Sequence, residues 1–268
     1  MKRRGLFLLQ LSFTLFVCAF LIVPMILSIM AGLTVNYFVG IESGLTLRWV
    51  MEVWNGYRDT IFLSIGLSLA CLAATLVLGI PAAYVLAKRQ TALTRAIEEL
   101  LVMPVAVPGL ATALALIVTY GTLSGFRTSW AFILVGHVLF TLPFMVRSVL
   151  AVLMAIDLKT LEEGAASLGA GFWERFRDIV LPNCRQGILA GSLMVVTLSM
   201  GEFNMTWLLH TPFTKTLPVG LADAYASLRL EIGSAYTLVF FIMIMPLLLA
   251  MQAFAKPRPA KFVAEETE

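Results

Sequence analysis

The sequence predicts an all-α membrane protein with six transmembrane helices. Of its 268 residues, 60% are hydrophobic and only 13% are charged, and the mean hydropathy is +0.92. A soluble domain of this size cannot bury so much apolar surface. Six stretches reach the roughly 20 apolar residues that a membrane span needs. They lie at approximately 6–32, 61–87, 100–120, 130–153, 187–209 and 235–254, which leaves little chain for a soluble domain.

The first stretch follows Lys2, Arg3 and Arg4, so it also fits the start of a secretory signal peptide. Its apolar run from Leu6 to about Met30 is longer than the roughly 7–15 residues of a signal-peptide core. It also contains no obvious small-x-small cleavage site. We therefore expect a retained first span and an outward-facing loop, which together occupy residues 1–59.

The third stretch opens with an interrupted pattern in which Pro104 and Pro108 are followed by Gly109. Proline breaks or kinks a helix, and a broken helix inside a membrane needs neighbouring helices or a water-filled cavity to satisfy its freed backbone groups. Pro104 and Pro108 are therefore candidates for a kink that lines a pathway. Simple helix packing is an equally good interpretation.

The fourth and fifth stretches each contain a charged residue. Arg147, near the end of the fourth, is interpreted as an interface anchor rather than a solute ligand. Glu202 lies about 16 residues beyond Gln186, roughly 24 Å into a helix that rises 1.5 Å per residue. An acid at this depth usually faces a cavity or a partner charge. Glu202 is thus the first candidate for the pathway or its gate, ahead of Asn204 and Thr206, with a structural ion pair or hydrogen bond as the equal alternative.

Basic residues predict the orientation, because Lys and Arg accumulate on the cytoplasmic side of a membrane. With six spans, both termini, the 154–186 loop and the 255–268 tail share the more basic side. We expect a multi-pass protein of the bacterial inner membrane with both termini in the cytoplasm. The net charge of +3 implies no nucleic-acid partner, since the charges lie at span ends. The basic side carries Lys2, Arg3, Arg4, Lys88, Arg89, Arg95, Lys159, Arg175, Arg177, Arg185, Lys256, Arg258 and Lys261.

The loop at 157–186 is predicted to begin with a short helix. Thr160 followed by Glu163 has capping-box spacing, which favours a helix start at Thr160. Leu161, Ala165 and Leu168 would form one apolar stripe on this helix. Gly169 is then expected as its C-terminal stop.

A second, amphipathic helix should follow after a bend. Phe172, Phe176 and Ile179 share one face, and charged residues cover the other. Pro182 should end this helix near Leu181, because the residue before a proline disfavours helical backbone.

The same loop carries a spaced motif. One residue separates Glu163 from Ala165, three residues separate Ala165 from Gly169, and nine residues separate Gly169 from an Ile-x-Leu-Pro sequence at 179–182. This pattern resembles the Glu-Ala-Ala motif of the permease subunits of binding-protein-dependent ABC importers. Gly164 departs from it, since alanine is usual there. Glycine costs roughly 1 kcal/mol relative to alanine in a helix, but it is still small enough for close packing.

The resemblance covers roughly residues 60–250 and implies a type I ABC importer permease fold, with a permease core at 60–254 and a cytoplasmic coupling helix in the loop. It implies that this helix docks on a separate ABC ATPase, which binds ATP and Mg²⁺. This chain would bind no cofactor or metal and would have no catalytic residue. A second permease subunit, identical or different, membrane lipid, and an extracytoplasmic binding protein facing segment 210–234 complete the implied partners. The implied coupling residues are Glu162, Glu163, Gly164, Ala165, Leu168, Gly169, Ile179, Leu181 and Pro182.

The expected solute class also comes from resemblance. Gly-Glu-Phe at 201–203, followed by Thr-Leu-Pro at 216–218, is similar to permeases for polyamines, phosphonates, ferric iron and tetrahedral oxyanions. We expect a small polar solute, foremost a polyamine such as spermidine or putrescine, or an aminophosphonate. Ferric iron, or an oxyanion such as sulfate or molybdate, is the alternative.

Other function classes have weaker support. The sequence contains no P-loop and no H-E-x-x-H zinc motif, and Ser124 lacks the G-x-S-x-G spacing of a serine hydrolase. An ion-coupled secondary transporter is a competitor, because six spans with one buried acid can host proton coupling. That interpretation leaves the loop motif unexplained. Cys18 and Cys71 lie in expected spans and Cys184 is expected to face the cytoplasm, so we expect no disulfide.

Overall fold

The computed structural model describes residues 2–255, and every regular element in this range is a helix. One isolated bridge within it pairs Thr34 with Leu45. Five helices are long and apolar enough to cross a membrane, and a bent pair is a sixth candidate. The all-α membrane fold is thus confirmed. Most of the expected tail at 255–268 lies outside the described residues, as do the side chains of Lys2 and Arg3.

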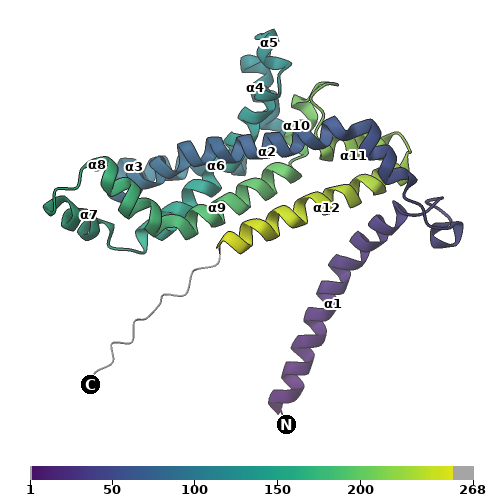
Figure 1. Ribbon diagram of the computed structural model, residues 1–268, viewed down its shortest axis with the longest axis horizontal. Coiled ribbons are helices and arrows are strands. Elements are labelled where there is room, and N and C mark those ends of the chain that lie inside the picture. Colours follow the sequence, from purple (N-terminus) through teal and green to yellow (C-terminus); the bar gives the residue numbers. More distant parts are fainter. Residues whose placement is uncertain (1, 256–268) are drawn as a thin grey trace.

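The centre of the fold is a bundle of three long helices, α2 (Arg48–Lys88), α6 (Trp130–Met154) and α9 (Leu181–Gly201). α6 packs extensively against both α2 and α9, and α12 (Leu230–Ala255) packs beside α2 and α9. These four helices run along the same direction in Figure 1. Helices suit these apolar stretches because each satisfies its backbone hydrogen bonds internally, as the hydrocarbon of a membrane requires.

Two glycines let α6 and α9 approach closely. A Cβ atom at Gly187 would lie 2.5 Å from the carbonyl oxygen of Ser148, and one at Gly191 would lie 2.8 Å from the sulfur of Met145. Small residues at such positions allow close helix packing in membranes. A larger side chain at either position would force α6 and α9 apart.

The first predicted span is present as α1 (Lys2–Ala31). This helix diverges from the bundle in Figure 1, and no residue of its apolar window is buried. It meets the bundle just past its C-terminal end, where Gly32 lies against Ser234 and Ala235 of α12.

Shorter elements connect the long helices. They are η1 (Gly40–Ser43), α3 (Ala92–Ala106), α4 (Gly109–Tyr120), α5 (Ser124–Arg127), α7 (Leu158–Ser167), α8 (Phe172–Arg175), the π-helical turn η2 (Phe176–Val180), α10 (Asn204–Leu209) and α11 (Leu217–Ala226).

Three predicted spans differ from the observed helices. The second begins at Arg48 rather than near 61, because polar turns extend the helix past its apolar stretch, with a kink at Tyr57. The third is two helices, α3 and α4, which meet at 101°. The break lies at Val107 and Pro108, since the residue before a proline takes extended backbone. The fifth is divided at Glu202 into α9 and α10.

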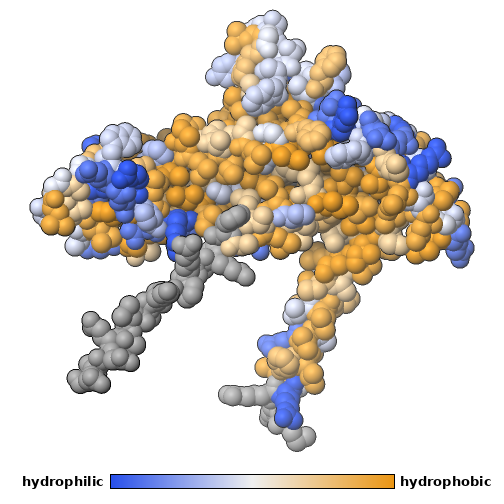
Figure 2. Space-filling view, in the orientation of Figure 1, coloured by the Kyte–Doolittle hydropathy of each residue, from blue (hydrophilic) through white to orange (hydrophobic). Residues whose placement is uncertain are grey.

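The surface of the bundle is hydrophobic along its length and hydrophilic at its two ends. Figure 2 shows hydrophobic residues along the length of the bundle and on much of α1. Hydrophilic residues gather at the end that carries α7 and α8 and at the opposite end, near α11 and the start of α2. Such a distribution is typical of a protein whose middle is surrounded by lipid.

Candidate coupling loop and helix-break junction

The first helix of the loop, α7, begins at Leu158, before the expected cap at Thr160. The carboxylate of Asp157 accepts a hydrogen bond from the Thr160 backbone N–H at 3.3 Å and one from the Thr160 hydroxyl at 2.6 Å. These hydrogen bonds lower the pKa of Asp157. The predicted start is wrong because Asp157 supplies a better acceptor at the same three-residue spacing. Glu163 is left on the surface, 3.8 Å from Lys159.

The predicted stop of this helix is confirmed. Gly169 has a φ of +90°, which glycine adopts without steric cost. Its N–H donates to the carbonyl of Ala166 at 3.0 Å, and the N–H of Ala170 donates to the carbonyl of Ala165 at 3.0 Å. These two bonds form a Schellman motif, which satisfies carbonyls that the helix end leaves free.

Two adjacent glutamates of α7 differ in burial. Glu162 is 4% exposed, and its carboxylate accepts a hydrogen bond from the Tyr84 hydroxyl at 2.6 Å and pairs with Lys88 at 2.9 Å. Burial alone would raise the pKa of Glu162, but the hydrogen bonds from Tyr84 and Lys88 and the charge of Lys88 outweigh it and lower the pKa. The side chain of Glu163 is 68% exposed. Glu162 therefore ties α7 to the end of α2.

The expected apolar stripe of α7 is not its packed face. Leu168 is 89% exposed and Leu161 is 43% exposed, whereas Ala165 is half-buried. The buried residues of α7 are Leu158 and Glu162. The prediction failed because a buried ion pair, rather than apolar contact alone, decides which side of α7 packs on α2. We use the name outer face of α7 for the exposed residues Leu161, Glu163 and Gly164 of this helix together with Leu168, which directly follows it.

The second helix does not end at Pro182. Residues Phe172–Gly201 form one long helix that passes through the π-helical turn Phe176–Val180. In this wider turn the N–H of Leu181 donates to the carbonyl of Phe176. Pro182 then occupies the first turn of α9, where a missing N–H is tolerated.

Side chains of this long helix anchor the loop in the bundle. Val180 and Cys184 are fully buried in the same apolar cluster as Tyr84, so Cys184 does not face the cytoplasm as expected. The rings of Phe172 and Phe176 lie 6.2 and 5.5 Å from that of Tyr84. Both parts of the loop thus contact Tyr84 of α2. Ile179 and Leu181 are half-buried and Pro182 is exposed.

A second polar site surrounds the break between α9 and α10. One carboxylate oxygen of Glu202 accepts from the backbone N–H of Met205 at 2.8 Å. The other accepts from the backbone N–H of Thr206 at 2.9 Å and from its hydroxyl at 2.6 Å. Glu202 therefore caps the start of α10. The helix is continuous from Gln186 to Gly201, so the predicted rise of roughly 24 Å to Glu202 stands, but the helix ends at Glu202 instead of continuing to residue 209.

His137 of α6 extends this polar site across the bundle. Its Nδ1 lies 2.9 Å from the hydroxyl of Ser199, and its Nε2 lies 2.8 Å from the hydroxyl of Thr206. Since the Thr206 hydroxyl donates to Glu202, its oxygen accepts from Nε2 of His137. Sequence reasoning did not connect His137 with Glu202. A histidine within an apolar span was the available signal.

The two helix breaks meet in space. A Cβ atom at Gly109, the first residue of α4, would lie 3.4 Å from Cβ of Asn204 and 3.7 Å from Oε1 of Glu202. We call residues 107–109 and 202–206 the helix-break junction. Pro108, Glu202, Asn204 and Thr206 belong to it, whereas Pro104 lies inside α3. Asn204 is exposed and Thr206 is buried. Across the described part of the chain, no group of three or more His, Cys, Asp or Glu residues is placed to hold a metal ion.

Comparisons with known proteins agree with the fold. Residues 76–256 match the family model described as "Binding-protein-dependent transport system inner membrane component". The chain is 25% identical over 240 residues to the putative 2-aminoethylphosphonate transport system permease protein PhnV of Salmonella typhimurium, covering 88% of this chain and 90% of that protein. It is 26% identical over 206 residues to the sulfate transport system permease protein CysW of Synechocystis, covering 71% and 74% of the two chains.

A solved structure has a similar fold. One chain in the crystal structure of a bacterial ABC transporter involved in the import of the acidic polysaccharide alginate aligns with a TM-score of 0.73. The alignment covers 95% of this chain and 96% of that one, at 18% sequence identity. The chain belongs to the family of binding-protein-dependent transport system inner membrane components, the membrane-embedded permease subunits of ABC importers.

Proposed function

We propose that the outer face of α7 is the docking surface for the ATPase of this importer. One observation carries the proposal: of two adjacent glutamates, Glu162 is buried against α2 while Glu163 projects from the surface. An outer face that has both charge and exposed leucines suits a protein partner better than open solvent. The end of α7 is fixed by the hydrogen bonds at Ala165 and Gly169. The loop is joined to α9 through the continuous helix that contains Ile179, Leu181 and Pro182. Both features keep the proposed docking surface in a defined position. ATP and Mg²⁺ bind on the partner ATPase.

The loop is built to transmit movement. Glu162 fixes α7 to α2, and the second part of the loop is continuous with α9. A displacement of the docked loop therefore reaches α9, which ends at Glu202 in the helix-break junction. Hinges in proteins are typically a few residues at the ends of helices, which absorb the change in backbone angles. ATP-driven closure would shift the population between inward-open and outward-open packings through this junction.

The proposed orientation follows the basic residues. Both termini and the α7–α8 loop face the cytoplasm, and residues 210–234, including α11, face outward and meet the solute-binding protein. The chain forms half of the pathway, and a second permease subunit, identical or different, forms the other half. In this arrangement the junction lies on the far side of the bundle from the ATPase.

For the solute, we propose an aminophosphonate. PhnV, which is named for 2-aminoethylphosphonate transport, aligns over most of both chains, and CysW is named for sulfate. Both compounds carry a tetrahedral oxyanion. Polyamines carry the opposite charge, and neither of these two names mentions them. A polyamine is therefore a second candidate, and its only support is the resemblance of the Gly-Glu-Phe segment to polyamine permeases.

Co-purification tests the docking proposal. The tagged full-length protein would be isolated from membranes together with its native partners and analysed by mass spectrometry, comparing wild type with a Glu163→Lys, Gly169→Asp double variant. Glu99→Lys, an equal charge reversal on exposed α3, is the matched control. Selective loss of the ATPase from the double variant supports docking at α7. Retention of the ATPase in that variant, or its absence from folded wild type, refutes it.

The co-purified binding protein then tests the solute. Isothermal titration with 2-aminoethylphosphonate, sulfate and spermidine would identify the class. Tight binding of 2-aminoethylphosphonate supports the proposal, and binding of spermidine alone refutes it. Transport driven by an ion gradient, without the ATPase, would remove the importer assignment altogether.

A further inference from the structure

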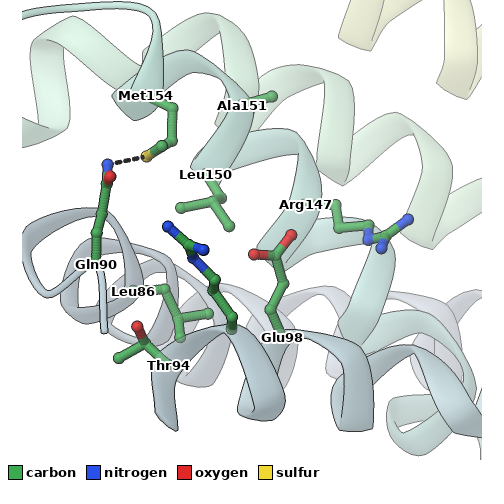
Figure 3. Close-up of a pocket in the computed structure, with 9 residues that line it drawn as sticks. Leu86, Gln90, Thr94, Glu98, Arg147, Leu150, Ala151 and Met154 are labelled. Carbon is green, nitrogen blue, oxygen red and sulfur yellow. Dashed lines mark hydrogen bonds between the residues drawn. The ribbon is translucent and has the colours of Figure 1, made fainter. Parts of the chain in front are cut away.

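A pocket of about 440 Å³ lies where the end of α2 and the start of α3 meet α6, outside the coupling loop and the helix-break junction. Figure 3 shows Gln90 and Met154 at one end of it and Glu98 and Arg147 at the other. Leu86 and Leu150 lie between them, and both are nearly fully buried. The pocket thus has an apolar floor and a polar rim.

The rim has an excess of positive charge. Arg95 and Arg147 both line the pocket, and Glu98 is the acid that lines it with them. Within residues 2–255, neither arginine forms an ion pair or a side-chain hydrogen bond, and both are exposed. Each guanidinium therefore has its donors available. A planar guanidinium binds the oxygens of a phosphate group in bidentate fashion.

The depth of the pocket in the membrane indicates which kind of anion it would bind. Arg147 lies seven residues before the end of α6 at Met154, or about 10 Å along the helix at 1.5 Å per residue. In the proposed orientation this is the cytoplasmic end of the bundle, at the depth where lipid headgroups meet acyl chains. Basic pockets between helices on this side of a membrane suit anionic headgroups.

We propose that this pocket binds one anionic phospholipid of the cytoplasmic leaflet. Arg95 and Arg147 hold the phosphodiester, and the acyl chains extend from Arg147 toward the middle of the membrane, away from the end of α6 at Met154. The Gln90 side chain, at the Met154 end of the pocket, can hydrogen-bond to headgroup hydroxyls, as phosphatidylglycerol offers them. The inference uses the proposed orientation and does not depend on the transported solute.

A lipid here would bear on gating because of the helix it contacts. α3 has no fully buried residue, although it packs beside α2 and α6. Its other end is the bend at Val107 and Pro108 in the helix-break junction. A lipid between α3 and α6 would add contacts that the protein itself lacks at this end. It would hold α3 in place while the junction moves.

Native mass spectrometry of the full transporter, delipidated and then titrated with phosphatidylglycerol or phosphatidylcholine, tests the proposal. Wild type should retain phosphatidylglycerol in preference to phosphatidylcholine. Arg147→Gln and Arg95→Gln should each weaken that retention about fivefold, since a basic residue near the membrane surface contributes about 1 kcal/mol to anionic-lipid binding. Arg185→Gln, an exposed arginine of α9 outside the pocket, is the matched control and should behave as wild type.

Equal retention by wild type and both pocket variants would overturn the proposal. Millimolar inorganic phosphate and 2-aminoethylphosphonate provide the second arm of the test. If either displaces the lipid completely, the pocket is a site for a free anion and the lipid assignment fails. The same spectra report whether the ATPase is bound, so a failure of the coupling proposal is seen separately from a failure of this one.

Discussion

The hydroxyl of Tyr84 in α2 donates a 2.6 Å hydrogen bond to the carboxylate of Glu162 in α7, while Lys88 holds the other carboxylate oxygen at 2.9 Å. The sequence motif therefore contains two acids with different surroundings. Glu162 holds α7 to the bundle, and its neighbour Glu163 is left on the outer face. A substitution at the first should change how α7 is held, and one at the second should change what α7 can bind.

Replacing Glu162 with alanine should loosen α7 without unfolding the bundle. The variant leaves the Tyr84 hydroxyl buried without its acceptor, which costs about 1–3 kcal/mol. A change of that size corresponds to about 5- to 150-fold in an equilibrium. Amide hydrogen exchange over residues 158–167 should accelerate within that range, while exchange within α6 stays the same.

Glu163→Ala is the matched control for that experiment. Its ion pair with Lys159 spans 3.8 Å between two exposed side chains, and such pairs contribute little to stability. Exchange over 158–167 should therefore remain as in wild type. Equal acceleration in both variants would show that Glu162 does not anchor α7.

Acid should weaken the same contact. The pKa of Glu162 in the folded protein is lower than its ordinary value, which is about 4.3 for a free glutamate. The contact therefore contributes fully above the ordinary pKa and is lost as the pH falls through the lowered, folded-state pKa. Hydrogen exchange over 158–167, corrected for its intrinsic pH dependence, should stay constant from neutral pH down to the ordinary pKa and rise below it. Glu162→Gln should reduce this rise and leave the part that comes from protonation of the Asp157 cap. An undiminished rise in that variant would assign the whole effect to Asp157 or another group.

Two glycines of the coupling loop should respond in opposite ways to alanine. Gly169 has a φ of +90°, where a side chain costs about 1–2 kcal/mol, so Gly169→Ala should disrupt the end of α7 and reduce ATPase co-purification. Gly164 lies inside α7 with nothing within 4 Å of an added Cβ. Gly164→Ala should stabilise α7 by about 1 kcal/mol and keep the ATPase bound. Loss of the ATPase from the Gly164 variant alone would reverse this assignment.

The predictions that succeeded rest on local signals. Gly169 was identified as a helix stop because few residues other than glycine adopt positive φ, so the residue type alone indicates the helix end. The apolar stretches were identified because a span must be about 20 residues long in any membrane protein.

The predictions that failed depended on distant contacts. Asp157 and Thr160 each have a possible capping partner three residues later, so the sequence alone does not choose between them. Neither the capping pattern nor the apolar stripe predicts that Glu162 is buried against Tyr84 and Lys88 of α2. Pro182 was predicted to end the second helix, but a π-helical turn accommodates it within a continuous helix. Glu202 was predicted to lie within one continuous helix. In the structure its carboxylate accepts hydrogen bonds from the backbone N–H groups of Met205 and Thr206, at the start of a new helix.

Glu202→Gln should destabilise the helix-break junction. The glutamine amide places an NH₂ group against backbone donors that the carboxylate accepts in wild type, at a cost of about 1–3 kcal/mol. The midpoint of thermal unfolding should fall by about 2–4 °C for each kcal/mol lost. Asn204→Ala, at an exposed residue of the same junction with no side-chain hydrogen bond in the described chain, should leave the midpoint unchanged.

Transport measured on the same two variants separates the two roles considered for Glu202. If the residue is a cap, transport and thermal stability should fall together, and a lower assay temperature should restore much of the transport. Loss of transport at unchanged stability would instead place Glu202 in contact with the solute.

Gly187→Ala should destabilise the bundle, although alanine is ordinarily the better helix former. The added Cβ would lie 2.5 Å from the carbonyl oxygen of Ser148 and 3.0 Å from Cα of Val149, both backbone atoms of α6. Such atoms cannot move aside without displacing the helix, so the overpacking should cost about 1–3 kcal/mol. Gly66→Ala in α2 has open space around the new Cβ and should be neutral or stabilising by up to about 1 kcal/mol. Thermal unfolding of the two variants in detergent measures the difference. Equal midpoints would mean that α6 and α9 are not in close contact at Gly187.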